Sequence, residues 1–170
     1  MIRKSLFFIL LLGTIVLDCK AQGTTYIALS IPITISEVLD LEVSPSTTLT
    51  FNFATTTQID NGITQVPAQT LTFKSNKAYY ITIKGIGITS NFSGGIAGSP
   101  MPISMLKYKL STSTEWIPLS TTSQVLTGSA TSMNPRGTGT ILVDFKVDPG
   151  YITHPAQDYM VTISYSIANQ

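Results

Sequence analysis

The sequence predicts an all-β fold, a single antiparallel β-sandwich, with a barrel as the lesser alternative. Thr and Ser make up about a quarter of the 170 residues, and only 11% of the residues are charged. Thr, Val and Ile lose rotamer freedom in helices and fit pleated sheets well. After residue 21, apolar side chains recur with a period of two and no 3.6-residue period appears, which is typical of half-buried strands.

Residues 1–21 have the features of a secretory signal peptide. Arg3 and Lys4 form a short basic region, residues 6–17 are almost wholly apolar, and Ala21 is a small residue at a cleavage position. This apolar run is shorter than the roughly 20 residues that span a membrane. We therefore expect residues 22–170 to be one exported domain, located extracellularly, at the cell surface or in the periplasm, with no transmembrane segment.

Cys19 is the only cysteine and lies inside the predicted signal peptide. The domain 22–170 therefore has no disulfide, and packing must stabilise it. An alternative interpretation makes Cys19 the lipidated first residue of an anchored protein. The intact mass of the exported chain distinguishes these two interpretations.

The first alternating segment of the domain comes near its start, and its apolar members are Ile27, Leu29, Ile31, Ile33 and Ile35. Ala, Ser, Pro and Thr occupy the positions between them, so one face is apolar and the other small or polar. Pro32 has no N–H for a ladder, which predicts an edge strand. We take residues 27–35 as a candidate donor or edge strand.

Similar alternation follows along the chain, separated by turn residues. Asp60-Asn61-Gly62 predicts a turn, and Ser75-Asn76-Lys77 predicts a tight hairpin. Eight to ten amphipathic strands can bury their apolar faces only by packing two sheets together or by closing one sheet. The predicted strand faces are Leu49, Phe51 and Phe53; Leu71 and Phe73; Tyr79, Ile81 and Ile83; Leu106, Tyr108 and Leu110; Ile141, Val143, Phe145 and Val147; Val161, Ile163, Tyr165 and Ile167.

Charge and chemistry exclude several classes of function. Without residues 1–21 the chain has seven basic and eight acidic residues, too few cations for a nucleic-acid surface. His154 is the only histidine, and no Gly-x-Ser-x-Gly motif accompanies it. One histidine and no cysteine cannot make a zinc or copper site. We expect no enzymatic activity, no catalytic or metal site and no cofactor.

Two aromatic residues are candidate exposed contacts. Tyr80 lies between Tyr79 and Ile81, which claim the inner face, so its ring is predicted to point outward. Trp116, with Tyr108 on an adjoining strand, could form a platform for stacking a sugar. Its apolar neighbours favour a core or sheet-edge position instead.

Three stretches resemble bacterial exported β-sandwich subunits of the spore-coat-protein-U and fimbrial-subunit kind. They are residues 49–63, residues 71–79 and the ending from Val147-Asp148-Pro149-Gly150-Tyr151 through Pro155 to Tyr165. The resemblance implies an immunoglobulin-like or fimbrial-like sandwich that is a non-enzymatic structural protein and assembles at the cell surface. Its partners would be copies of itself or related subunits, joined by strand addition.

Two alternatives stay open at this stage. Residues 27–35 can instead be the first strand of a self-complete sandwich, which is the interpretation we favour from the sequence. The second alternative is a monomeric extracytoplasmic module that binds glycans or proteins through Tyr80 or Trp116.

Overall fold

The computed structural model describes residues 30–45, 48–87, 89–94, 100–150 and 156–169. The chain divides into two units, Met1–Ile35 and Ser36–Gln170, and each is described by itself. In the first unit, residues 30–35 have no regular secondary structure. The predicted signal peptide, Cys19 and His154 lie outside the described residues.

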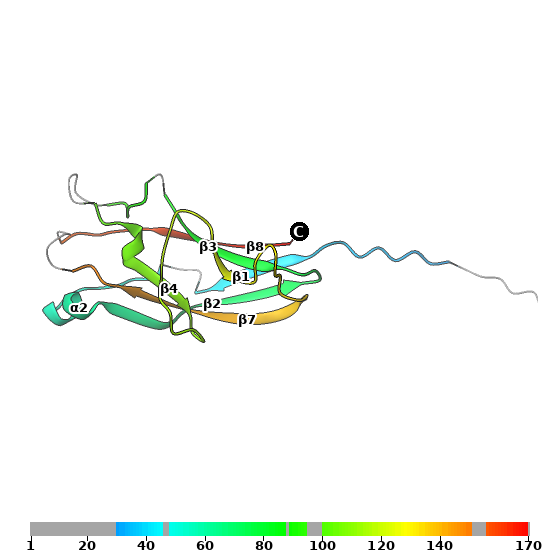
Figure 1. The fold of residues 1–170 in the computed structure, drawn as a ribbon, viewed down its shortest axis with the longest axis horizontal. Helices are drawn as coiled ribbons and strands as arrows, with labels where there is room; N and C mark the ends of the chain where they lie inside the picture. Colours follow the sequence, from blue (N-terminus) through cyan, green and yellow to red (C-terminus); the bar gives the residue numbers. More distant parts are fainter. Residues whose placement is uncertain (1–29, 46–47, 88, 95–99, 151–155, 170) are drawn as a thin grey trace, which may run out of the picture. The chain divides into compact units, whose positions relative to one another are not determined.

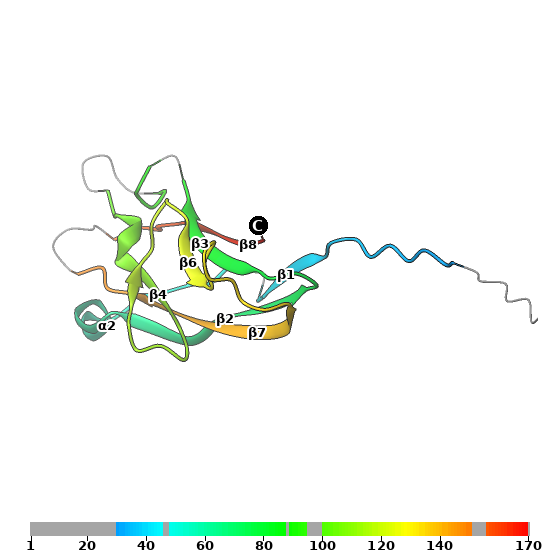
Figure 2. The same ribbon diagram turned by 45° about the vertical axis from the view of Figure 1, so that its right-hand side comes forward.

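The second unit is built almost entirely from antiparallel strands in two sheets (Figure 1). The larger sheet has the strand order β1-β2-β7-β4-β5, and the smaller has the order β6-β3-β8 (Figure 2). The predicted all-β sandwich is thus confirmed, as two sheets and not one closed sheet. The elements are β1 (Leu39–Ser44), α2 (Thr56–Asn61), β2 (Ile63–Ser75), β3 (Tyr80–Ile86), η1 (Ile103–Met105), β4 (Leu106–Leu110), β5 (Ile117–Pro118), β6 (Gln124–Thr127), β7 (Gly137–Val147) and β8 (Thr162–Ala168).

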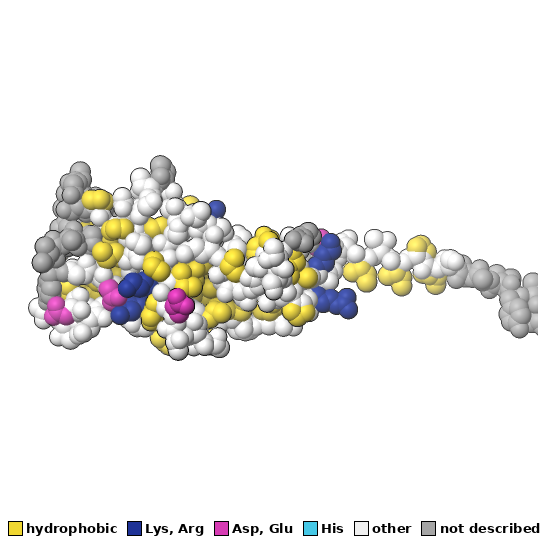
Figure 3. All heavy atoms as spheres, in the orientation of Figure 1, with side chains coloured by type: hydrophobic (Ala, Val, Ile, Leu, Met, Phe, Trp, Pro, Cys, Tyr) yellow, Lys and Arg dark blue, Asp and Glu magenta, His cyan; other side chains and the backbone are white. Residues whose placement is uncertain are grey.

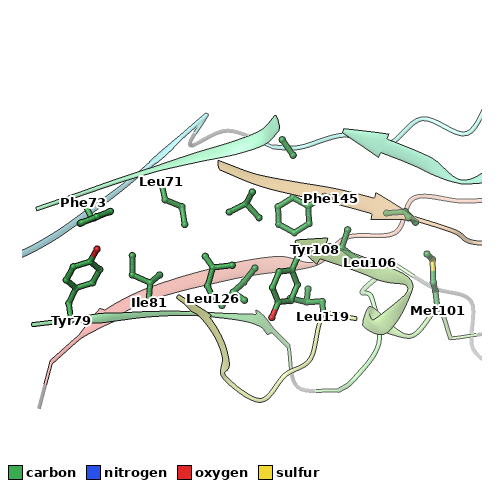
Figure 4. Close-up of a cluster of buried hydrophobic side chains, with 14 residues drawn as sticks. Leu71, Phe73, Tyr79, Ile81, Met101, Leu106, Tyr108, Leu119, Leu126 and Phe145 are labelled. Carbon is green, nitrogen blue, oxygen red and sulfur yellow. The ribbon is translucent and has the colours of Figure 1, made fainter. Parts of the chain in front are cut away.

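The core lies between the two sheets, as Figure 4 shows. Leu71 and Phe145 of the larger sheet face Ile81 of the smaller one, and all three side chains are fully buried. Tyr108 joins them from β4. These are alternate residues of their strands, as the period of two predicted. Fully burying such a side chain contributes about 1.5–3 kcal/mol.

Three local predictions need correction. Ser75-Asn76-Lys77 is not a hairpin, because β2 and β3 belong to different sheets and the segment crosses between them. Asp60 and Asn61 end the short helix α2 and Gly62 follows with a φ of 72°, so the predicted turn is the end of a helix that begins at a capping box of Thr55 and Gln58. The first strand of the sandwich is β1, Leu39–Ser44, and residues 30–35 form no strand.

One edge of each sheet is short or irregular. At one edge of the larger sheet, β5 is only two residues long and ends in Pro118, which has no N–H to donate. At one edge of the smaller sheet, the pairing of β6 with β3 shifts register between Ile81 and Thr82. Such features discourage the addition of another strand. Within the described residues, no helix has the length and apolar character needed to cross a membrane.

Candidate functional site

The described part of the candidate donor segment is exposed and apolar. Ile31, Ile33 and Ile35 are 73%, 82% and 80% exposed, and every residue from 30 to 38 is exposed. Figure 3 shows apolar side chains in full view along this segment. Ile27 and Leu29 lie outside the described residues. Three large aliphatic side chains in alternate positions with no burial are a strong candidate for an interaction surface.

Among the described strands each sheet has two edges, and the longest edge strands are β1, with six residues, and β8, with seven. β1 pairs only with β2, and β8 pairs only with β3. β1 and β8 belong to opposite sheets and contact each other across the sandwich. An edge of this kind presents free backbone N–H and C=O groups to an added strand.

An apolar groove lies at the start of β8, with a volume of about 740 Å³. One wall is the extended segment 48–53, in which Leu49, Phe51 and Phe53 are half-buried and the residues between them are exposed. The opposite wall is formed by Val161 and Ile163 at the start of β8. We call this feature the groove, and its floor consists of the core residues Met101, Leu106 and Val147.

The wall segment 48–53 belongs to no strand, although its alternation predicted one. The side-chain amide of Gln65 donates a hydrogen bond of 2.7 Å to the carbonyl of Thr50. The alternating residues Leu49, Phe51 and Phe53 therefore pack against the core, but their backbone pairs with none of the described strands.

The groove carries little charge. Asp158 is the only carboxylate among its lining residues, and no basic residue lines it. Phe92 and Tyr159 pack edge to face at one end, with their ring centroids 6.5 Å apart. A lining of this composition fits a neutral, aliphatic peptide segment better than a charged ligand.

Two tyrosines of the core have raised pKa values. Tyr165 follows Ile163 on the same face of β8, and its hydroxyl donates to Oε1 of Gln69 at 2.5 Å. Burial, and secondarily the proximity of Tyr108, raises the pKa of Tyr165 far above 10.0. Burial alone raises the pKa of Tyr108, whose hydroxyl is buried without a hydrogen-bond partner in the described residues.

The two candidate aromatic contacts do not come together. Tyr80 is half-buried on β3 of the smaller sheet, whereas Trp116 precedes β5 of the larger sheet. Tyr108, the predicted partner of Trp116 in a sugar platform, is buried in the core. The platform prediction is therefore wrong, and a separate contact role for either ring stays a prediction.

A polar cluster, which sequence reasoning missed, lies on the outer face of the larger sheet. Asp144 is completely buried, and its carboxylate accepts from the Ser111 hydroxyl at 2.5 Å and pairs with Lys109 Nζ at 3.0 Å. Lys109 also donates to the carbonyl of Ser113 and lies 5.3 Å from the ring centroid of Trp116. Lys109 and Asp144 come together because they are cross-strand partners on β4 and β7. Their separation in the sequence does not predict this pairing.

No constellation typical of an enzyme or metal site is present in the described part of the chain. No three His, Cys, Asp or Glu side chains gather there. The Asp144 carboxylate is bonded and covered, so it is a structural group. The groove and the exposed isoleucines are the features left to explain.

Comparison with known proteins adds little to this geometry. No family model matches the sequence, and no curated protein matches it significantly. A solved structure of a chaperone-usher pilus is similar with 6% identity and a TM-score of 0.45, over 88% of this chain and 97% of that chain. Likeness at this level assigns nothing, so we argue function from the groove and the segment alone.

Proposed function

We propose that this protein is a non-enzymatic structural subunit that assembles by strand addition. Residues 27–35 of one copy would enter the groove of the next and pair with the free edge of its β8. Export of the domain 22–170, by way of residues 1–21, belongs to the same proposal. The observation that carries it is that the chain has two complementary features: exposed alternating isoleucines, and an apolar groove that reaches the start of the edge strand β8.

The chemistry of the two features is complementary. Strand addition needs main-chain groups on an edge and pockets for alternate side chains of the incoming segment. The edge of β8 supplies the main-chain groups. Leu49, Phe51 and Phe53 border the space for the alternate side chains. Ile31, Ile33 and Ile35 have the required period of two.

Apolar burial would supply the main driving force for this contact. Burial of each exposed isoleucine contributes about 1.5–3 kcal/mol before the costs of association and ordering. Main-chain hydrogen bonds along β8 would add to it. Each Pro or Thr between them faces away, where side-chain size matters less.

The test compares three variants of the mature chain by light scattering at several concentrations. The wild-type chain should form concentration-dependent oligomers, and deletion of residues 22–35 should leave a folded monomer. Ile33→Asp should abolish assembly because it places a charge in the apolar groove. Thr34→Asp is the matched control, because it places the same charge on the opposite face and should still assemble.

The proposal fails if the wild-type chain is a monomer at every concentration, or if the deletion variant unfolds. It also fails if Thr34→Asp and Ile33→Asp weaken assembly equally. The intact mass of the exported chain separately tests cleavage after Ala21 against lipidation of Cys19.

A further inference from the structure

We propose that a cluster of hydrogen bonds at the start of β1 directs the N-terminal segment to a second copy and away from the chain's own groove. The cluster, called the clamp here, consists of Glu37, Asn76, Lys77 and Asn169. This inference rests on the proposed function. It adds what prevents self-filling, in which residues 27–35 would occupy the groove of their own chain and not that of a second copy.

Asn76 continues the β1–β2 ladder beyond its last strand pair. Leu39 pairs with Ser75, and the next residues outward are Val38 and Asn76. The N–H of Asn76 donates to the carbonyl of Val38 at 3.2 Å, and the N–H of Val38 donates to Oδ1 of Asn76 at 2.9 Å. Nδ2 of Asn76 donates to the carbonyl of Ser36 at 2.8 Å. The backbone of residues 36–38 is therefore held in line with β1.

Glu37 adds a second attachment at the same place. Its Oε2 pairs with Lys77 Nζ at 2.8 Å, and its Oε1 accepts from Nδ2 of Asn169 at 2.7 Å. Asn169 directly follows β8. One carboxylate thus ties the start of β1 to the β2–β3 connection and to the end of β8.

The clamp and the groove lie at opposite ends of β8. β8 begins beside the groove at Ile163 and ends at Ala168, next to the clamp residue Asn169. Asn169 lies six positions after Ile163 along extended chain, a span of about 20 Å. The two features are therefore separate sites on one strand.

Self-filling would need a reversal of the chain at the clamp. A segment that fills its own groove must run beside β8 from the groove to the clamp, parallel to β8, and then turn back into β1. The turn would fall on residues 36–38, whose backbone groups are bonded to Asn76 in an extended path. A segment from a second copy reaches the groove without that turn.

The test uses the clamp variant Glu37→Gln with Asn76→Ala and follows thermolysin cleavage at Ile31, Ile33 and Ile35 by mass spectrometry. In the wild-type chain, protection of these residues should fall on ~100-fold dilution, because occupancy by a second copy depends on concentration. In the clamp variant, protection should persist on dilution in a monomer, because the chain can fill its own groove. Asn61→Ala, which removes one side-chain bond in α2, is the matched control and should behave like wild type.

Each outcome has a separate meaning. A clamp variant that assembles and loses protection on dilution like wild type overturns the inference. A variant that loses protection at every concentration also overturns it, because the clamp would then serve stability alone. A wild-type chain without protection at any concentration contradicts the proposed function itself.

Discussion

The Asp144 cluster and the groove differ in how the chain covers them: its own residues cover the first, and no described residue fills the second. Asp144 is a buried carboxylate that accepts a hydrogen bond from Ser111 and forms an ion pair with Lys109 of β4, and the ring of Trp116 lies beside Lys109. The groove is apolar, and no described segment of the sandwich fills it.

The difference indicates what the chain can supply for itself. A buried carboxylate is costly unless it is bonded, so its partners had to come from nearby residues of the same chain. An apolar groove needs only an aliphatic segment of the right period, which a second copy can provide. The open groove is therefore understandable as half of an interface.

The largest loss of stability should come from a substitution in the closed core. The matched substitution in the groove should affect assembly more than stability. Phe145→Ala should lower the free energy of unfolding by about 3–5 kcal/mol, because it leaves a cavity in a fully packed site. Phe53→Ala should lower it by only about 1 kcal/mol in the monomer, because its ring is half-buried, yet should weaken assembly strongly. Urea denaturation and light scattering measure the two effects. Equal losses of stability would show that the groove is ordinary core.

The Asp144 cluster should be next in size. Asp144→Ala should cost about 3 kcal/mol in unfolding free energy, because Lys109 and Ser111 lose a buried partner. Asp158→Ala is the control, since Asp158 is exposed at the groove and its removal should change stability by less than about 0.5 kcal/mol. Neither change should reduce assembly. A stable Asp144→Ala variant would contradict the assignment of this cluster as structural.

The smallest effect should appear at high pH. The folded-state pKa of Tyr165 lies above its unfolded value of 10.0, so its contribution is complete below pH 10 and is lost as the pH rises toward the raised pKa. Above pH 10 the free energy of unfolding should fall by up to about 1.4 kcal/mol per pH unit for this group. Urea midpoints between pH 8 and 11 measure the slope. Tyr165→Phe should flatten this pH dependence. An unchanged slope would mean that water reaches the Tyr165 hydroxyl.

Much of the sandwich was predictable from residue alternation. The burial of Ile81, Val143 and Phe145 follows from the sequence, because a period of two determines which face of a strand is buried whatever its partner strand is. The same rule placed Asp144 on the outer face. It could not predict the burial of Asp144, because the covering loop depends on the register of β4 with β7.

The errors have a common physical origin. Residues 49–53 have the alternation of a strand but make no ladder in the described chain, because alternation reports burial and not pairing. Residues 27–35 have the alternation of a first strand for the same reason, but their described part, residues 30–35, forms none. Ser75-Asn76-Lys77 suggested a hairpin, yet the chain crosses between sheets there, and turn residues alone do not determine which sheet comes next.

The short β5 strand, with Pro118 at its end, has a consequence for the geometry of growth. A subunit in which one edge of each sheet disfavours further strands, and which binds its neighbour at β8, offers its own segment at a separate place. Such head-to-tail contacts cannot branch. Copies of this chain joined in that way would form a single-file thread, or a ring if the rotation between successive copies closes.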